Sequence, residues 1–253
     1  DLRDAKLSRV NFRGADLSKA RLDHVDLTQA DFTGATLDSS NLLGANLTGA
    51  SFRGADLSES RLNSANCDHV DFTGAYLGWA EMLGVSVVEA DMTRTDFKHA
   101  RCEGVKFQKV TLVSTRFRHA ILENADFSGA DKIDFCDFSK ANCTNSNLQG
   151  AMIGSSSFRK ASLCGANLNG VRTTSSAGDF RKADLTTATV RGAELYGSDF
   201  RDSFLHGVDF CYARLDRSDF KGALITVDTK FEEAHLSDVD FNHTYFEVTQ
   251  TSS

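Results

Sequence analysis

Large apolar side chains recur at every fifth position along most of the chain. From Leu2 to Phe127 every fifth residue is apolar, with the small Cys67 and Cys102 at two of these places, and a small residue, usually alanine, lies two positions before each, as Ala15 lies before Leu17. The repeating unit therefore reads A(D/N)LxG. A period of five fits neither the 3.6 residues per turn of a helix nor the alternation of a strand. The pattern predicts a chain that turns a corner every fifth residue and coils around a shared core.

The spacing of the phenylalanines indicates how many units complete one coil. The first series takes every fourth unit and consists of Phe12, Phe32, Phe52 and Phe72. The second series keeps the same step or a slightly longer one and consists of Phe97, Phe117, Phe138, Phe158, Phe180, Phe200, Phe220 and Phe241. Four units per coil predict an all-β, four-sided solenoid, and the chain length predicts roughly twelve coils.

The longer steps in the second series indicate where extra residues enter the repeat. They fall within 130–135, within 171–177 and at Asp228, and the register recovers after each one. Bulges that leave the stack intact are the simplest interpretation. We expect a single solenoid over residues 1–247 and a short C-terminal tail over 248–253. Because the chain starts inside the repeat and without Met, we interpret it as a processed or excised piece of a longer protein.

The repeated unit resembles that of the pentapeptide-repeat family, across essentially the whole chain. Examples are Ala15-Asp16-Leu17, Ala45-Asn46-Leu47 and Ala166-Asn167-Leu168. The resemblance implies a right-handed quadrilateral β-helix, with the large and small residues pointing inward and the other three outward. It specifies function less well than fold: the best-understood members mimic DNA and bind type II topoisomerases, and many others have no known role.

Charged residues flank the second phenylalanine series on the outside. The basic ones follow the phenylalanines: Lys98, Arg118, Arg159, Arg181, Arg201 and Lys221, then Lys140, Lys160 and Lys182 one position further. The residues that precede the phenylalanines are mostly aspartates, as at Asp137 and Asp179. Mutual neutralisation of a solvated surface is one interpretation, since exposed ion pairs contribute only about 0 to 1 kcal/mol. A docking ridge for an acidic partner is the other, and Lys140, Lys160 and Lys182 favour it as positive charges without matching acids.

Apolar residues also stand at a few positions where the pattern expects polar ones. Phe204, Leu224 and Tyr245 are expected to stack on one side in three successive coils, which favours a contact with a cap, a second copy or a partner. Tyr76 and Trp79 form a smaller candidate patch, and we interpret them as isolated aromatics that lie on the rod. The candidate partner-binding residues are Lys98, Arg118, Arg159, Lys160, Arg181, Lys182, Arg201, Lys221, Phe204, Leu224 and Tyr245.

Catalytic and metal-binding patterns are not evident. His99 and His119 are expected one strand spacing apart, but no third ligand joins them, and the six cysteines show no CxxC spacing. Cys102 and Cys143 are expected in the core. Glycines such as Gly34 recur at the corners, where their expected role is backbone geometry. We therefore predict no enzyme activity, no catalytic residues, no metal and no cofactor.

Composition and charge narrow the classes of partner that the protein is expected to bind. The 253 residues carry a formal net charge of -7, which disfavours bulk attraction to nucleic acid or to an anionic membrane. Direct nucleic-acid binding is also disfavoured because the basic rungs face aspartates and no aromatic stacking platform is evident beside them. No apolar run is long enough to span a membrane. We expect reduced thiols and a cytoplasmic location, with a processed chain in another compartment as the alternative.

Two functions are compatible with this surface. The first is a non-enzymatic protein-interaction or scaffold module. The apolar positions near one end support it, and so do the open ends of the solenoid, which a partner would cover. The second is DNA mimicry against gyrase or another topoisomerase, of the quinolone-resistance type. Aspartates before the large residue support it, including Asp16, Asp26, Asp31, Asp56, Asp71, Asp126, Asp184 and Asp209. The modest net charge and the basic column count against it.

Overall fold

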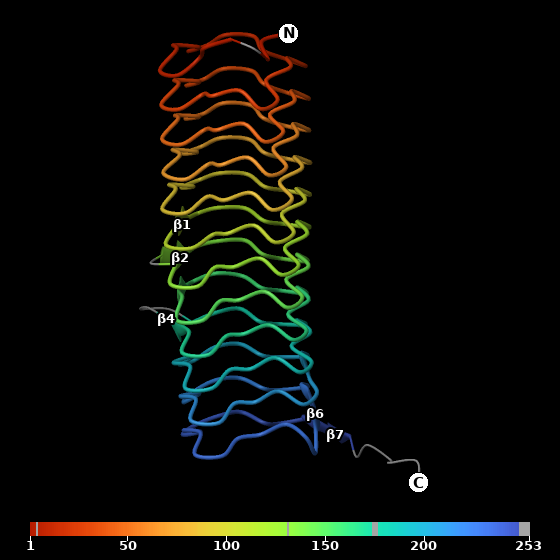
Figure 1. The fold of residues 1–253 in the computed structure, drawn as a ribbon. Helices are drawn as coiled ribbons and strands as arrows, with labels where there is room; N and C mark the ends of the chain where they lie inside the picture. Colours follow the sequence, from red (N-terminus) through yellow and green to blue (C-terminus); the bar gives the residue numbers. More distant parts are fainter. Residues whose placement is uncertain (4, 131, 174–176, 248–253) are drawn as a thin grey trace.

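The chain forms a long rod of stacked coils, with the N-terminus at one end and the last described residues at the other (Figure 1). The computed structural model describes residues 1–3, 5–130, 132–173 and 177–247. These residues include strands, bridges and turns but no helix. The all-β expectation is confirmed for this part of the chain.

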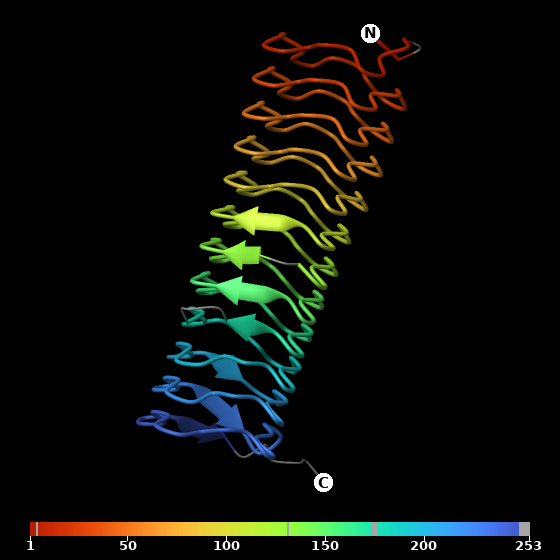
Figure 2. The same cartoon turned by 90° about the vertical axis from the view of Figure 1, so that its left-hand side faces the viewer.

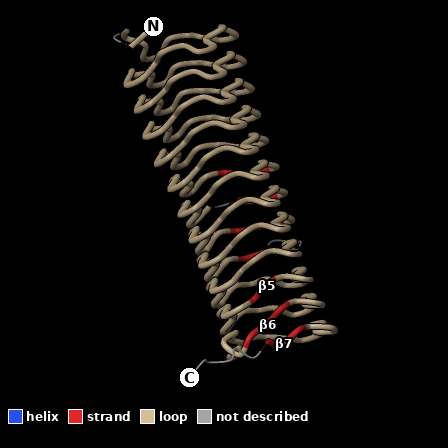
Figure 3. Tube along the Cα trace, turned by 90° about the vertical axis from the view of Figure 1, so that its right-hand side faces the viewer, coloured by secondary structure: helices blue, strands red, loops and turns tan. Residues whose placement is uncertain are grey.

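Two parallel sheets lie on different sides of the rod (Figures 1 and 3). The first sheet, seen face-on in Figure 2, contains β1 (Thr111–Val113), β2 (Lys132–Asp134), β3 (Met152–Gly154) and β4 (Arg172–Thr173) in this order. The second contains β5 (Phe204–Leu205), β6 (Leu224–Thr226) and β7 (Tyr245–Glu247). All strands pair in parallel because each coil rises in the same direction as the one before it.

Elsewhere the coils are joined by isolated parallel bridges at a regular step. Asp16 bridges Thr36, and Thr36 bridges Asp56, so one coil contains four repeat units there. The step is two residues longer between Ser157 and Asp179 and one residue longer between Asp209 and Lys230. Of the ranges 130–135 and 171–177, in which extra residues were predicted, residue 131 and residues 174–176 lie outside the described residues. At the third place, Val227 and Asp228 are exposed.

The large residues of successive coils stack inside the rod. Phe32 and Phe52 have ring centroids 4.6 Å apart with planes 3° apart, and Phe180 lies 4.9 Å from Phe200. A third series that the sequence analysis missed includes Phe107, whose ring meets Phe117 edge-on at 86°. Cysteine, valine and leucine interrupt this third series, so its period is hidden among other apolar residues.

Four of the cysteines belong to this core: Cys67, Cys102, Cys136 and Cys143. Burial raises the pKa of the Cys143 thiol to about 12. The expectation that Cys102 and Cys143 are core thiols is confirmed. Cys164 is half-buried on the outside of the rod, and all six sulfurs are unbonded to one another.

Corners are made by the second residue after a large one, which adopts a positive φ on every described side except at Val227. Gly34 has a φ of 66°, a value that glycine adopts without strain. Lysine occupies the same position at Lys140, with a φ of 60°. Its backbone N–H donates a hydrogen bond of 3.0 Å to the carbonyl of Arg159 in the next coil. Corner residues are therefore held in a straight line along the rod, each tied to the coil that follows.

Both ends of the rod leave part of the core uncovered. Leu7 and Phe12 are only half-buried at one end, as are Leu236 and Phe241 at the other, whereas the core phenylalanines from Phe32 to Phe220 are fully buried. A solenoid shows this pattern because the last coils have a neighbour on one side only.

Candidate functional site

Parallel bridges place the charged residues of the second phenylalanine series in one column. The bridged residues that precede each phenylalanine are Asp96, Arg116, Asp137, Ser157, Asp179, Asp199, Asp219 and Asp240. The predicted basic residues follow the same phenylalanines and therefore lie a short distance further along each coil. The structure brings them together on one side, but it divides them into two groups with different partners.

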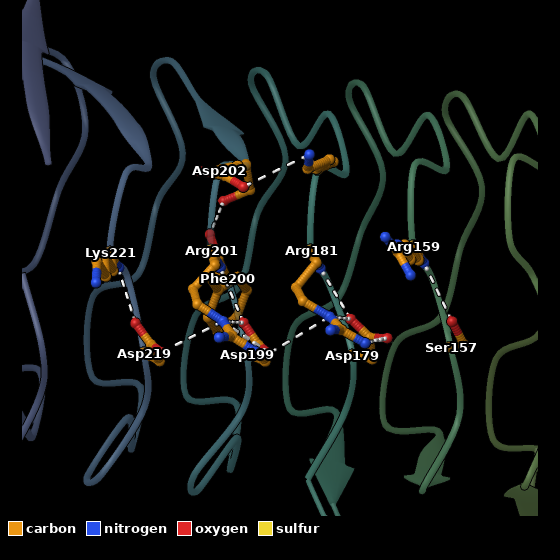
Figure 4. Close-up of polar contacts among 12 residues, drawn as sticks. Ser157, Arg159, Asp179, Arg181, Asp199, Phe200, Arg201, Asp202, Asp219 and Lys221 are labelled. Carbon is orange, nitrogen blue, oxygen red and sulfur yellow. Dashed lines mark hydrogen bonds and ion pairs between the residues drawn. The ribbon is translucent and has the colours of Figure 1, made fainter. Parts of the chain in front are cut away.

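The first group is a ladder of ion pairs near the C-terminal end, formed by Asp179, Arg181, Asp199, Arg201 and Asp219 and called the paired ladder below (Figure 4). Each arginine holds the aspartate of its own coil: Nη2 of Arg181 lies 2.7 Å from Asp179, and Nη2 of Arg201 lies 2.6 Å from Asp199. Each also reaches the next aspartate, at 3.5 and 3.4 Å. This stretch fits the interpretation of mutual neutralisation.

The ion pairs shift the titration of the groups in the ladder. Partial burial would raise the pKa of Asp179, but the hydrogen bonds and the charge of Arg181 outweigh it, so this pKa lies below its usual value. The same contact raises the pKa of Arg181. Lys182 belongs with this group because its Nζ lies 3.8 Å from Asp202. The expectation that Lys182 lacks a matching acid is therefore wrong.

The second group is the basic strip, which consists of Lys98, Arg118, Lys140, Arg159 and Lys160. None of these five side chains forms an ion pair with another described residue. Lys140, Arg159 and Lys160 lie on the two coils next to the paired ladder. The local sequence explains the difference. Ser157 stands where the ladder has an aspartate, and its hydroxyl accepts a hydrogen bond from the backbone N–H of Arg159 at 3.4 Å but carries no charge (Figure 4).

Arginine replaces the acid on another coil of the basic strip. Arg116 occupies the position before Phe117, and its Nε lies 3.2 Å from Asp96 of the preceding coil. Arg116 thus pairs with that carboxylate, and Arg118 has no acid before the phenylalanine of its own coil. Two substitutions of the position that precedes phenylalanine, at Arg116 and Ser157, therefore leave Arg118 and Arg159 without an acid on their own coils.

A shallow hollow of about 260 Å³ opens in the basic strip. Its lining residues are Arg118, Asp137, Ser139, Lys140, Arg159 and Lys160. Four positive side chains against one carboxylate leave a net charge of +3 around this hollow. Oδ1 of Asp137 accepts a hydrogen bond from the backbone N–H of Ser139 at 2.8 Å, and the hydroxyls of Ser139 and Ser157 are 3.1 Å apart.

A stack of rings continues the basic strip toward the N-terminus. Trp79 and His99 are parallel with centroids 4.2 Å apart, and His99 lies 4.9 Å from His119. Partial desolvation, followed by the charge of Lys140, lowers the pKa of His119. The interpretation of Trp79 as an isolated aromatic is therefore wrong, and an aromatic stack does lie beside the basic residues. The sequence feature that could have revealed this stack is the spacing of Trp79, His99 and His119, which occupy the same corner position in three successive coils.

The apolar edge lies near the C-terminal end, and it comprises Phe204, Leu224 and Tyr245. Phe204 pairs with Leu224, and Leu224 pairs with Tyr245, so these side chains share one side of β5, β6 and β7 as expected. Phe204 is 46% exposed and Tyr245 is 64% exposed. Phe246 occupies a position that the repeat assigns to the core, yet it is 73% exposed because no coil follows it among the described residues.

Lys221, the last basic candidate, and the aspartates on two other sides of the rod lie outside the basic strip and the paired ladder. Lys221 is exposed, and its backbone N–H donates to Asp219 at 2.9 Å. On the side of the first phenylalanine series, Arg53 lies 2.8 Å from Asp71. On another side, Arg191 lies 2.8 Å from Asp209. Burial alone would raise the pKa of Asp209, but hydrogen bonds from Cys211 and Arg191 outweigh it and lower this pKa to about 2.

Groupings typical of metal sites and membrane spans were also sought. The described residues contain no cluster of three or more His, Cys, Asp or Glu side chains suited to a metal ion. Within the same part of the chain there is no helix long and apolar enough to cross a membrane. The contacts described above therefore make the outer surface of the rod, with its basic strip and apolar edge, the candidate site.

Several solved structures are similar to the chain. HetL, a pentapeptide repeat protein involved in heterocyst differentiation regulation in the cyanobacterium Nostoc, is 23% identical over 95% of this chain and 92% of its own, with a TM-score of 0.35. A pentapeptide repeat protein of the Arabidopsis thaliana thylakoid lumen is 33% identical over 40% of this chain and 70% of its own, with a TM-score of 0.39. A trypsin-treated form of QnrB1, a plasmid-mediated fluoroquinolone resistance protein, is 20% identical over 84% and 86%, with a TM-score of 0.33.

Family membership rests on the repeats themselves. No curated protein matches the chain. The family model for pentapeptide repeats matches in 8 copies, over residues 1–34, 40–78, 112–131, 134–170 and 191–226. These ranges cover more than half of the sequence, so the chain belongs to the pentapeptide-repeat family.

Proposed function

We propose that this chain is a non-enzymatic interaction scaffold that docks an acidic protein partner on the basic strip. The observation that carries the proposal is the contrast within one column: Arg181 and Arg201 are held by aspartates, whereas Arg118 and Arg159 form no ion pair with any described residue. Solenoids bind through continuous surfaces, and charges that are unpaired on the free protein are available to a partner.

The shape of the scaffold is part of this proposal. We infer a right-handed, four-sided rod of about twelve coils, because the bridges recur after every four repeat units along most of the chain. Its coils are spaced by about 4.8 Å, so the basic strip is about 15 Å long over four coils. A rigid surface of this length fits a short acidic segment.

Binding to poly-L-glutamate, followed by fluorescence anisotropy across a salt series, tests the proposal. The double variant Lys140→Gln/Lys160→Gln removes two positive charges from the basic strip, and we expect its affinity to fall about fivefold or more at low salt. The matched control Lys182→Gln/Lys221→Gln removes the same charge outside the strip and is expected to bind nearly as well as the parent. Equal losses in both variants would show that only net charge matters.

DNA mimicry remains the second candidate, on one specific observation. Aspartates occupy the bridged position on four successive coils, at Asp179, Asp199, Asp219 and Asp240, as a row of phosphate mimics requires. The ion pairs from Arg181 and Arg201 neutralise much of this row, which places mimicry second. A gyrase supercoiling assay with and without a quinolone separates the two: inhibition or drug protection at micromolar protein would favour the mimic.

A further inference from the structure

We propose that the hollow in the basic strip binds the phosphate group of a phosphorylated protein segment. This inference rests on the proposed function and specifies the chemistry of the partner. The hollow brings four cations from three coils around one space of about 260 Å³, whereas each ladder arginine is already bound to aspartate. That volume is roughly that of nine water molecules, which suits one charged group better than a drug-sized ligand.

The number of cations favours phosphate over carboxylate. One arginine satisfies a carboxylate, as Arg201 does for Asp199 through two nitrogens in the paired ladder. A phosphorylated side chain carries a charge of about -1.5 to -2 and three acceptor oxygens. Arg118 and Arg159 supply forked donors, and Lys140 and Lys160 supply mobile ones, so the hollow matches the larger charge.

The ends of the basic strip favour a short segment over a long polyanion. Glu59 occupies the corner position before Trp79, and Asp202 occupies the corner position after Lys182, in the same line of corner residues. A nucleic-acid strand that follows the rod beyond the basic strip would meet the carboxylate of Glu59 at one end and, at the other, Asp202 already paired with Lys182, so neither end extends the row of unpaired cations. A single phosphate on a peptide would contact only the basic strip, which lies between Glu59 and Asp202.

Asp137 is the one carboxylate on the hollow and offers a sharp test. Its Oδ1 accepts the N–H of Ser139, and an asparagine Oδ1 makes the equivalent bond elsewhere, from Asn142 to the N–H of Thr144 at 3.2 Å. Asp137→Asn therefore keeps the local hydrogen bond and removes only a negative charge. If phosphate occupies the hollow, this variant binds it several-fold more tightly, because one repulsive charge is gone.

The experiment compares three fluorescein-labelled peptides that differ only at one residue, which is phosphoserine, serine or glutamate. Binding is measured by anisotropy with the full chain, and thermal melts verify that each variant is folded. We expect the phosphopeptide to bind about tenfold more tightly than the glutamate peptide. Arg159→Gln is expected to reduce phosphopeptide affinity about tenfold, whereas Arg201→Gln, which removes an arginine from the equivalent position in the paired ladder, leaves it nearly unchanged.

The outcomes separate this inference from the proposed function. Equal binding of the phosphoserine and glutamate peptides, lost in Arg159→Gln, would overturn the phosphate assignment and leave acidic docking intact. Failure of both peptides and of poly-L-glutamate would overturn both proposals. Tighter binding of a single-stranded oligothymidine than of the phosphopeptide would assign the basic strip to nucleic acid. An unchanged or weaker phosphopeptide affinity in Asp137→Asn would show that the phosphate lies outside the hollow.

Discussion

The basic strip and the paired ladder lie over the same series of stacked phenylalanines, yet their positive charges differ: those of the strip form no ion pair with a described residue, and those of the ladder are paired with aspartates. In both, an arginine follows phenylalanine, as Arg159 follows Phe158 and Arg181 follows Phe180. The residue before phenylalanine makes the difference: Ser157 leaves Arg159 unpaired, and Asp179 binds Arg181. On these two coils, the residue before phenylalanine therefore decides whether the arginine is available to a partner.

The comparison also shows that core and surface are independent in this fold. Phe138 and Phe158 stack at 4.7 Å in the basic strip, and Phe180 and Phe200 stack at 4.9 Å in the paired ladder. Because the inward residues are the same, substituting the outward ones changes the surface without changing the stack. The predictions below test this independence, beginning with the core.

Phe138→Ala and Phe180→Ala are expected to destabilise the protein equally, by about 3 to 5 kcal/mol each, since both rings are fully buried between neighbours. Urea denaturation measures the loss. A markedly smaller cost for one of them would mean that the two regions differ inside as well as outside, and an unchanged melting curve would place that ring outside the core.

Ser157→Asp is expected to convert one coil of the basic strip into a coil of the paired ladder. The new carboxylate would pair with Arg159, stabilise the protein by at most about 1 kcal/mol, and lower poly-L-glutamate affinity several-fold. Ser51→Asp is the matched control, because Ser51 also precedes Phe and Arg and also shares a 3.1 Å hydroxyl contact, with Thr33. Similar effects of the two variants on binding would contradict the proposed site.

Asp179→Asn is expected to cost at most about 1 kcal/mol at neutral pH, because the ion pair with Arg181 is partly exposed and screened. The pKa of Asp179 is lower in the folded protein than its usual 3.8, so its contribution is present above pH 3.8 and is lost as the pH falls through the folded value. Chemical denaturation of parent and variant across this range measures the difference, which should disappear in acid. A difference that persists in acid would exclude the ion pair as its source.

His119→Gln is expected to have the smallest effect, seen only as a change in pH dependence. The pKa of His119 is lowered below 6.5 by desolvation and by Lys140, so its contribution to stability is present above pH 6.5 and lost as the pH falls through the folded value. Melting temperature, with Trp79 emission as a local probe of the stack, should fall less steeply below pH 6.5 in the variant. Identical slopes would mean that the stack tolerates the charge.

Periodicity alone predicted much of this structure. The recurrence of apolar residues at every fifth position indicated an all-β solenoid, and the regular step between coils aligned Phe204, Leu224 and Tyr245, as the strand register confirms. Such alignment depends only on the backbone, which the repeat determines. The predicted single unit over 1–247 and the eleven partner-binding candidates stay predictions.

Side-chain pairing was harder to predict, because it depends on reach between coils. Arg201 reaches Asp219 of the next coil at 3.4 Å, and Lys182 reaches Asp202, although neither contact is between residues close in sequence. The stack of Trp79 on His99 likewise depends on rotamers at corner positions. Serine at position 157 was the one readable signal that Arg159 differs from Arg181.

The lengthened coil near Asp228 has a consequence for how this rod tolerates change. Asp209 reaches Lys230 with one residue more than the usual step, and Asp219 reaches Asp240 with the same excess, so the next coil has regained alignment with the one before it. In a helix or a two-sided strand, one inserted residue would rotate every later side chain to a new face. Here the bridges between coils align again within one coil, so residues can be inserted at one corner while the residues of later coils keep their sides of the rod.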